Sequence, residues 1–261
     1  MQSIKAHIRR VPLVGDIALL GQALITGRWK TDPGFWIRTL LRRRKAQIVV
    51  IGANDGQTGD PIAQLIHEKK CWHVLFVEPV PYLFERLKKN YSGSSRFTFV
   101  NVAIASESES KTFYWVDEKA KDDFPSISRF YDQLGSFNRD HILHHLDGVL
   151  EPYIITGEVQ SIPLNDLLKR SGLTMIDLLQ IDTEGYDYIV LSGLDLSTYQ
   201  PTLILFEHRH LSAEDKQRAI RFLSTNYNTI YQFKKDILAV HRTVAPLGKL
   251  MLRFLESKRV N

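Results

Sequence analysis

Cysteine is nearly absent from this chain of 261 residues, because Cys71 is the only one. A single cysteine excludes an intramolecular disulfide, a thiolate zinc cluster and a Cys-X-X-Cys redox pair. Long apolar runs are absent as well. Residues 11–25, the most apolar early stretch, are interrupted by proline and glycine and fall short of the ~20 residues that a membrane-spanning helix needs. The same stretch lacks the cleavage pattern of a signal peptide. These absences predict a cytoplasmic protein.

A strong charge of one sign is also missing, since the net charge is only +5. Much of it lies in residues 1–45, which end in the basic run Arg42 to Lys45. That run follows a helical pattern, where cations complement the helix dipole and face water. No basic motif interleaved with aromatic residues accompanies it, so we expect no nucleic-acid partner. A peripheral membrane contact through N-terminal helices and a homodimer both stay open.

From residue 46 onward, short apolar runs alternate with helical patterns, which is typical of a parallel sheet covered on both faces. We therefore predict an α/β fold with a Rossmann-like, doubly wound and mostly parallel sheet. The runs rich in β-branched and aromatic residues, which we expect to form its strands, are residues 47–51, 73–77, 97–105, 175–181 and 202–206.

Helices are expected between these strands. The pair Asp60-Pro61 predicts a helix that continues to about Lys70, since an acidic cap followed by proline suits the first helical turn. Residues 229–233 and 237–241 are split by a polar turn and predict an antiparallel hairpin at the sheet edge. Further helices are predicted at residues 82–90, 184–193 and 212–224.

Two segments interrupt the alternation and indicate how the chain is organised. Residues 1–45 predict an N-terminal helical extension, and residues 46–261 predict the Rossmann-like domain. Within that domain, residues 117–156 carry proline, several serines and glycines and a short amphipathic stretch. We interpret this segment as a lid-like insertion, because long excursions from a regular fold commonly carry function.

A glycine-rich turn follows the first strand and opens a helix, at the strand end where a doubly wound sheet binds its ligand. It is not the dinucleotide fingerprint, because Asn54 replaces the second glycine and Gln57 the third. The acidic residues of the turn would repel a pyrophosphate, whereas they suit the sulfonium and amino groups of S-adenosylmethionine. The residues of the turn that we expect to bind this cofactor are Gly52, Asn54, Asp55 and Gly56.

Three later strand ends extend the predicted cofactor site. Glu78 ends the second strand, and an acid at about this distance after the loop commonly accepts hydrogen bonds from ribose hydroxyls. Asn101 and Ala103 belong to the third strand and are expected to flank the adenine ring. Asp182 ends the fourth strand and is expected to point into the same crevice.

Transfer of a methyl group to a hydroxyl needs mainly alignment and a general base, because the donor is already activated. Asp182 and Glu184 are expected to shape the methionine and acceptor side of the site. A histidine is expected to act as the base, and His208 after the fifth strand is the predicted residue. The other candidate bases are Glu207, His210, His141 and His144.

Histidines in the insertion raise the question of a metal site, since His141, His144 and His145 have the spacing of one helical face. A solvated helix face on a mobile lid explains the same residues. No carboxylate cluster bounded by glycine accompanies them in the sequence. We therefore expect chemistry without a metal.

Taken together, these motifs resemble the FkbM family of S-adenosylmethionine-dependent methyltransferases over about residues 46–210. The segments that carry the resemblance are residues 50–56, 77–79, 101–103, 136–141, 162–168 and 181–185. One departure is Gln180, where family members often carry lysine, and it leaves any lysine-dependent role in question. The resemblance implies methyl transfer, and family members of known function mostly methylate hydroxyls of sugars or secondary metabolites.

Two other classes share this architecture, because a fold does not fix a function. A nicotinamide-dependent oxidoreductase is disfavoured by the missing glycines of the loop. A non-catalytic nucleotide-binding or membrane-associated protein would instead rely on the basic N-terminal region.

Overall fold

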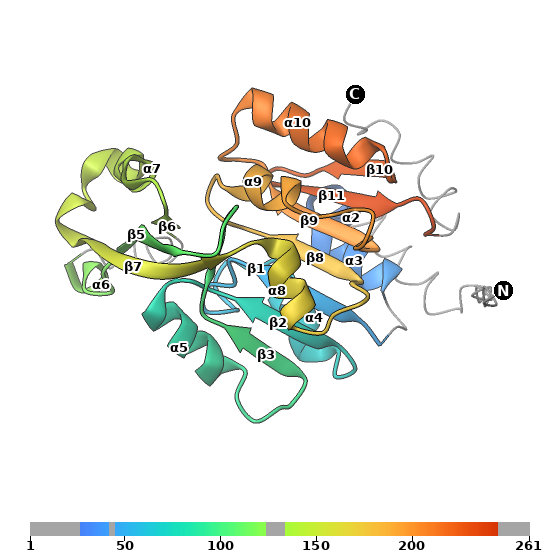
Figure 1. The fold of residues 1–261 in the computed structure, drawn as a ribbon, viewed down its shortest axis with the longest axis horizontal. Helices are drawn as coiled ribbons and strands as arrows, with labels where there is room; N and C mark the ends of the chain where they lie inside the picture. Colours follow the sequence, from blue (N-terminus) through green and yellow to red (C-terminus); the bar gives the residue numbers. More distant parts are fainter. Residues whose placement is uncertain (1–26, 42–44, 124–133, 245–261) are drawn as a thin grey trace.

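Seven strands form the main sheet of this computed structural model, which describes residues 27–41, 45–123 and 134–244. Their order is β10-β11-β9-β8-β1-β2-β3, and Figure 1 shows helices on both sides of the sheet. Strands β3, β2, β1, β8 and β9 run parallel, while β11 and β10 add an antiparallel edge. The predicted Rossmann-like, mostly parallel fold is confirmed. The bounds are β1 (Gln47–Ile51), β2 (His73–Val77), β3 (Phe97–Val100), β8 (Leu178–Ile181), β9 (Leu203–Glu207), β10 (Tyr227–Gln232) and β11 (Asp236–His241).

The strand predicted at residues 97–105 is divided in the structure. Its first part is β3, whereas β4 (Ala103–Ile104) belongs to a second, smaller sheet. Between them, the side-chain amide of Asn101 donates to the backbone oxygens of Glu78 and Pro79, at 2.7 and 3.0 Å. These bonds tie the chain to the segment that follows β2, so the ladder of the main sheet ends there.

Helices α4 (Ala63–Glu68), α5 (Pro81–Asn90), α9 (Asp187–Ser192) and α10 (Ala213–Ser224) occupy the predicted places, and α8 (Leu164–Arg170) is additional. Two of them begin later than predicted. Asp60 accepts the backbone N–H of Ile62 at 2.7 Å and caps a turn that precedes α4. Glu184 has a φ of 50°, a left-handed conformation that cannot start a right-handed helix. Helix α9 therefore begins at Asp187.

The core has two layers because alternate residues of the buried strands face opposite sides of the sheet. Val49 and Ile51 of β1 pack in a cluster with side chains of α8, α9 and α10. Ile48 and Val50 pack in a second cluster with side chains of α4 and α5. This two-sided burial is what a doubly wound sheet requires, and it holds the strand ends in fixed positions.

Part of the predicted N-terminal extension packs on this core. Helices α2 (Arg28–Thr31) and α3 (Pro33–Leu40) precede β1, and Trp36 of α3 stacks on Tyr231 of β10 with ring centroids 5.5 Å apart. Residues 1–26 and the basic residues 42–44 lie outside the described part of the chain. Among the helices that the structure describes, none is long and apolar enough to cross a membrane.

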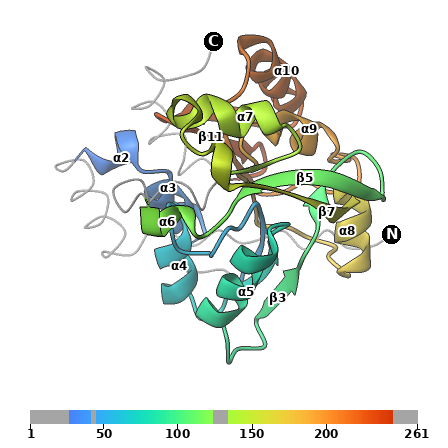
Figure 2. The same ribbon diagram turned by 90° about the vertical axis from the view of Figure 1, so that its left-hand side faces the viewer.

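The second sheet has the order β4-β7-β5-β6 and was not predicted from the sequence. Strands β5 (Ser110–Val116) and β7 (Ile154–Ile162) pair in antiparallel fashion, and β6 (Gly135–Ser136) adds to β5. The short helix α6 (Ala120–Asp123) follows β5. Helix α7 (Arg139–His144) and two short 3-10 turns lie between β6 and β7. Figure 1 shows this unit projecting from one side of the main sheet, and in Figure 2 it faces the viewer. Its role as a lid stays a prediction.

Candidate functional site

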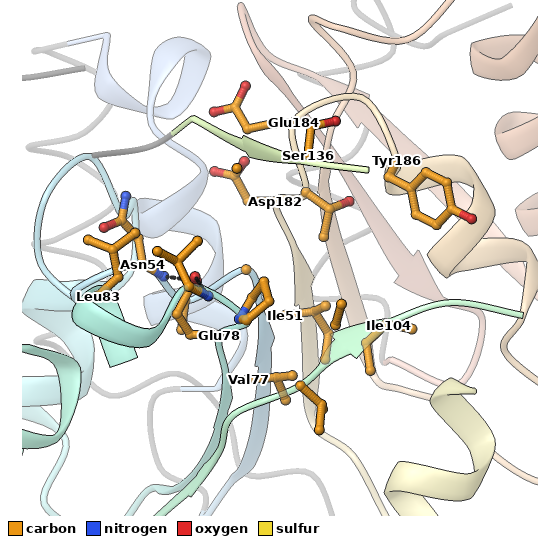
Figure 3. A pocket seen from close by; sticks show the side chains of 18 of the residues that line it. Ile51, Asn54, Val77, Glu78, Leu83, Ile104, Ser136, Asp182, Glu184 and Tyr186 are labelled. Carbon is orange, nitrogen blue, oxygen red and sulfur yellow. Dashed lines mark hydrogen bonds between the residues drawn. The ribbon is translucent and has the colours of Figure 1, made fainter. Parts of the chain in front are cut away.

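A cavity lies beyond the carboxyl ends of β1, β2 and β8, the edge at which a doubly wound sheet binds its ligand (Figure 3). It encloses about 850 Å³, open mouth included, and so falls within the roughly 300–1,000 Å³ of small-molecule sites. The second sheet contributes to one wall of the cavity. Of the residues predicted from the sequence, the lining includes Gly52, Asn54, Glu78, Ala103, Asp182 and Glu184.

Gly52 determines how closely the ends of β1 and β8 approach each other. Its φ is +74°, and a Cβ atom built on it would lie 1.7 Å from the backbone oxygen of Asp182. No side chain fits at that distance, and the left-handed conformation also favours glycine. The glycine therefore lets the loop after β1 and the loop after β8 meet at the floor of the cavity.

Glu78 holds the loop that follows β1. One of its carboxylate oxygens accepts the backbone N–H of Asn54 at 2.7 Å, shown as a dashed line in Figure 3, and the other accepts that of Val80 at 2.9 Å. Asn54 itself has a φ of 52°, which is uncommon for a residue other than glycine and is a feature of functional sites. Each carboxylate oxygen keeps a free lone pair with which it can accept a ligand hydroxyl.

Three residues predicted to bind the cofactor lie elsewhere. The Asp55 carboxylate accepts the backbone N–H groups of Gln57 and Thr58 at 2.8 and 2.7 Å, so it shapes its own turn. Gly56 is buried beneath the ring of Tyr91, whose hydroxyl donates to its backbone oxygen at 2.6 Å. Asn101 is exposed, and its amide bonds the strand ends described above. None of these three lines the cavity, and their contact with a cofactor stays a prediction.

The charge of the cavity is entirely acidic. Among the described residues that line it, Asp60, Glu78, Asp182 and Glu184 carry carboxylates and none is lysine, arginine or histidine. Burial raises the pKa of Asp60 to about 6 and that of Glu78 to about 7. An anionic ligand would be repelled here, whereas a ligand that carries positive charge would be attracted.

Gln180 takes part in this arrangement, at the position where the sequence resemblance led us to look for lysine. Its side chain is buried and donates to Asp60 at 3.2 Å. The second oxygen of Asp60 and the oxygen of Gln180 are buried without a hydrogen-bond partner among the described residues. The buried charge of Asp60 therefore has an amide beside it in place of a cation.

The acidic end of the cavity is formed by Asp182 and Glu184, which Figure 3 shows close together at the end opposite Val77. Burial and the neighbouring carboxylates of Glu207 and Glu184 raise the pKa of Asp182 well above its usual value. Burial, and to a lesser extent the negative charge of Glu184, raises the pKa of Glu207 to about 8. Carboxyl groups with pKa values near neutrality are suited to accept a proton.

His208, the predicted base, is not part of this arrangement. It does not line the cavity, and its Nε2 atom lies 3.1 Å from the backbone oxygen of Phe233. The structure thus places His208 outside the lining of the cavity, and its assignment as the base stays a prediction. The histidines near the acidic end are His141 and His210, whose Nε2 atoms lie 3.5 and 3.6 Å from Glu184 Oε2.

An aromatic wall was missed by the sequence analysis. Three aromatic rings line the cavity and contact one another in a row, namely those of Phe113 of β5, Phe137 after β6 and Tyr186 after β8. The Phe113 and Phe137 ring centroids are 5.0 Å apart and those of Phe137 and Tyr186 are 5.3 Å apart. The strand that carries Phe113 could have been predicted from the run of aromatic and β-branched residues at 112–116.

The raised carboxyl pKa values predict how the stability of the ligand-free protein depends on pH. A carboxyl whose pKa is higher in the folded state binds more protons there, so stability falls as pH rises toward the folded pKa. Burial raises the pKa of both Glu78 and Asp187 to about 7. Ionisation of each carboxyl should lower the free energy of unfolding by about 1 kcal/mol between about pH 6.5 and pH 8.

Thermal unfolding at several pH values checks this expectation. The melting temperature should fall over that window by roughly 2–4 °C for each kcal/mol lost. Glu78→Gln should flatten the slope, while Glu85→Gln on the exposed side of α5 should leave it unchanged. Below about pH 6.5 two half-buried histidines act in the opposite direction, since partial burial lowers the pKa of His145 and His210. A melting temperature that rises from pH 6.5 to 8 would contradict the assignment.

Comparison with known families gives one match, in which residues 51–256 fit the family model described as "Methyltransferase FkbM domain". No curated protein sequence is significantly similar to this chain. The family model alone therefore identifies a family.

Several solved structures are similar in fold. A crystal structure of methyltransferase FkbM from Methylobacillus flagellatus KT has a TM-score of 0.47 and 13% identity, over 87% of this chain and 60% of that chain. This chain thus spans about 60% of the length of that relative. Human methyltransferase-like protein 13 in complex with SAH has a TM-score of 0.42 and 12% identity, over 95% and 92%. A TehB-like SAM-dependent methyltransferase from Corynebacterium glutamicum has a TM-score of 0.35 and 12% identity, over 87% and 97%.

Proposed function

Because this chain belongs to the family of FkbM methyltransferase domains, we propose that it transfers a methyl group to a hydroxyl of a small molecule, such as a sugar or a secondary metabolite. The observation that carries the proposal is the cavity lined by four carboxylates and no cationic side chain, with an aromatic wall beside its acidic end. The same observation disfavours a nicotinamide cofactor, since a pyrophosphate would be repelled.

The methyl donor of the family is S-adenosylmethionine, which supplies a methyl group already activated on a sulfonium, so the cofactor predicted from the sequence is confirmed. The residues of the cavity fit it by their chemistry. Glu78 offers free lone pairs for ribose hydroxyls, and buried Ala103 gives a small apolar surface for a flat ring. The acidic lining as a whole suits the positive charges of the donor.

The acceptor hydroxyl has to lose a proton during or after attack, and we assign its removal to Asp182. This residue lines the cavity at its acidic end, and burial together with the neighbouring carboxylates raises the pKa of its carboxyl, which makes the carboxylate a stronger proton acceptor. The rings of Phe113, Phe137 and Tyr186 offer an apolar face against which the flat side of a sugar or an aromatic ring can pack. These rings exclude water and orient the hydroxyl.

The experiment that tests this function is release of S-adenosylhomocysteine in the presence of a panel of acceptors, with the methylated product identified by mass spectrometry. Hydroxyl-bearing sugars and aromatic metabolites form one arm, and amines and carboxylic acids of similar size form the other. Turnover confined to the hydroxyl arm supports the proposal. Turnover confined to the amines, or methylation of a nitrogen in an amino sugar, would overturn it.

Asp182→Asn separates the role of Asp182 in turnover from a role in binding. Loss of a general base is expected to lower kcat by roughly 100- to 10,000-fold, while the affinity for S-adenosylmethionine changes by less than tenfold. Asp166→Asn, at an exposed position on α8, is the matched control and should behave like the wild type. Steady-state kinetics and calorimetry make the two measurements. Unchanged turnover in Asp182→Asn would exclude this residue as the base.

A further inference from the structure

Three histidines and one glutamate converge beside the acidic end of the cavity, from segments far apart in the sequence. His141 lies on α7, His145 follows it at the start of a 3-10 turn, Glu184 follows β8 and His210 follows β9. One ligand atom from each of the four lies within 4.8 Å of every other. We propose that these four side chains form a site for one divalent transition-metal ion of the zinc type, which fixes the second sheet to the edge of the main sheet.

Two of the distances in this group match those of ligands around a common centre. The Nε2 atoms of His141 and His210 lie 3.5 and 3.6 Å from Glu184 Oε2, which is too long for a strong hydrogen bond. Four ligands at 2.0–2.2 Å from a tetrahedral zinc ion are separated from each other by about 3.3–3.6 Å. The spacing therefore leaves room for an ion between the side chains.

The rings are arranged around that space. The centroids of His141 and His145 are 4.9 Å apart, those of His145 and His210 are 5.2 Å apart, and those of His141 and His210 are 5.4 Å apart. The three imidazoles thus form a nearly regular triangle. His141 and His145 can share one face because they are four residues apart along the chain.

Two atoms of the cluster are buried without a hydrogen-bond partner among the described residues, namely Nε2 of His141 and Oε2 of Glu184. Buried polar atoms of this kind are rare unless a ligand or an ion satisfies them. Glu184 also adopts a left-handed backbone with a φ of 50°, a conformation that is uncommon outside glycine and is found at ligand-binding sites. Both observations are explained by a cation that binds the two atoms.

The ligand types specify the class of ion. Imidazole nitrogens suit zinc, copper, iron and nickel, whereas magnesium and calcium prefer oxygen ligands. Four protein ligands fill a tetrahedral site, which is typical of structural rather than catalytic zinc. The site thus serves to hold α7 and its neighbours in place, and because Glu184 also lines the cavity, the ion would join this unit to the edge of the cavity.

His144 provides a control within the same helix. It is exposed, and its Nδ1 atom lies 2.6 Å from the backbone oxygen of Asp140, outside the cluster. The sequence grouped His144 with His141 and His145 on one solvated face. The structure separates it from them and adds His210 and Glu184 from the main sheet.

The test uses untagged full-length protein that has been treated with a chelator and then titrated calorimetrically with zinc chloride. We expect one equivalent to bind and the melting temperature to rise, while magnesium chloride does neither. His145→Ala and His210→Ala should each weaken zinc binding at least tenfold, and His144→Ala should bind as the wild type does. Circular dichroism of each variant shows whether it is folded, and His145→Gln replaces any alanine variant that is not.

Absorption spectra of the cobalt-loaded protein give a second measurement, since cobalt in a tetrahedral site with nitrogen ligands absorbs visible light strongly. Failure of the wild type to bind one equivalent of zinc would overturn the proposal, and so would equal losses in His144→Ala and His145→Ala. S-adenosylmethionine binding by the chelator-treated protein is measured in parallel. Its loss in both the chelator-treated and the zinc-loaded protein would count against the proposed function and not against the metal site.

Discussion

Replacing Gly52 with alanine is expected to lower the free energy of unfolding by roughly 2–5 kcal/mol, because two costs add together. A left-handed conformation costs a residue with a Cβ atom about 1–2 kcal/mol. An added atom in a packed region costs about 1–3 kcal/mol, and here it would lie 1.7 Å from the backbone oxygen of Asp182. Since the clash separates the ends of β1 and β8, affinity for S-adenosylmethionine should fall as well.

Gly93→Ala is the matched control for this prediction. Gly93 has a φ of +81°, and a Cβ atom built on it meets nothing within 4 Å. The Gly93→Ala variant should therefore lose only about 1–2 kcal/mol of the free energy of unfolding, which is the cost of the left-handed conformation. It should keep the affinity of the wild type for the cofactor. Denaturant unfolding and calorimetry measure both quantities. Equal destabilisation in the two variants would show that the close approach of the strand ends is not what Gly52 provides.

Glu78→Ala is expected to reduce affinity for S-adenosylmethionine and for S-adenosylhomocysteine on the order of 100-fold or more. Hydrogen bonds to a charged group contribute about 1.5–3 kcal/mol each, and every factor of ten in affinity is about 1.4 kcal/mol. The variant removes the acceptor for ribose hydroxyls and also frees the backbone N–H of Asn54, which shapes the loop.

Calorimetric titration with both adenosyl compounds measures this effect, with NADH as a ligand that should not bind. Glu85→Ala, on the exposed face of α5, serves as control because it changes the same residue type without touching the cavity. The melting temperature of each variant separates a lost contact from a lost fold. Wild-type affinity in a folded Glu78→Ala protein would exclude this residue from the ribose site.

The sequence predicted the sheet and part of the cavity because both depend on local pattern. Parallel strands end at one edge, so polar residues placed directly after β1, β2 and β8 have to meet there. Glu78 and Asp182 could be assigned in this way. The two residues end buried strands, and no loop intervenes that could turn them elsewhere.

Residues further from a strand end could not be placed. After Glu207, the last residue of β9, the chain reads His208, Arg209 and His210, and a loop imposes no regular period on the directions of its side chains. His208 was chosen as the base, yet His210 is the histidine that approaches Glu184. Asp55 presented a similar difficulty, since an acid in a turn can bind a ligand or its own backbone with equal ease.

The second sheet was missed for a different reason. Strands β5 and β7 pair residues that lie far apart in the chain, as when Lys111 meets Val159, and sequence pattern alone does not report such pairing. Strand β5 lies just before the predicted insertion of residues 117–156, in a stretch for which no strand was predicted. Phe113 and Phe137 enter the cavity only through this pairing, so the aromatic wall was invisible before the structure.

The ladder between β5 and β7 also determines how acceptor preference can change during evolution. Seven consecutive residue pairs, from Ser110 with Gln160 to Val116 with Ile154, make the unit stiff, and Gly157 leaves room for the ring of Trp115 across the ladder. Alternate residues of a strand face opposite sides. On the proposed function, substitutions at the cavity-facing position 113 can therefore alter which acceptors fit while positions 112 and 114, on the opposite face of the ladder, continue to hold the framework.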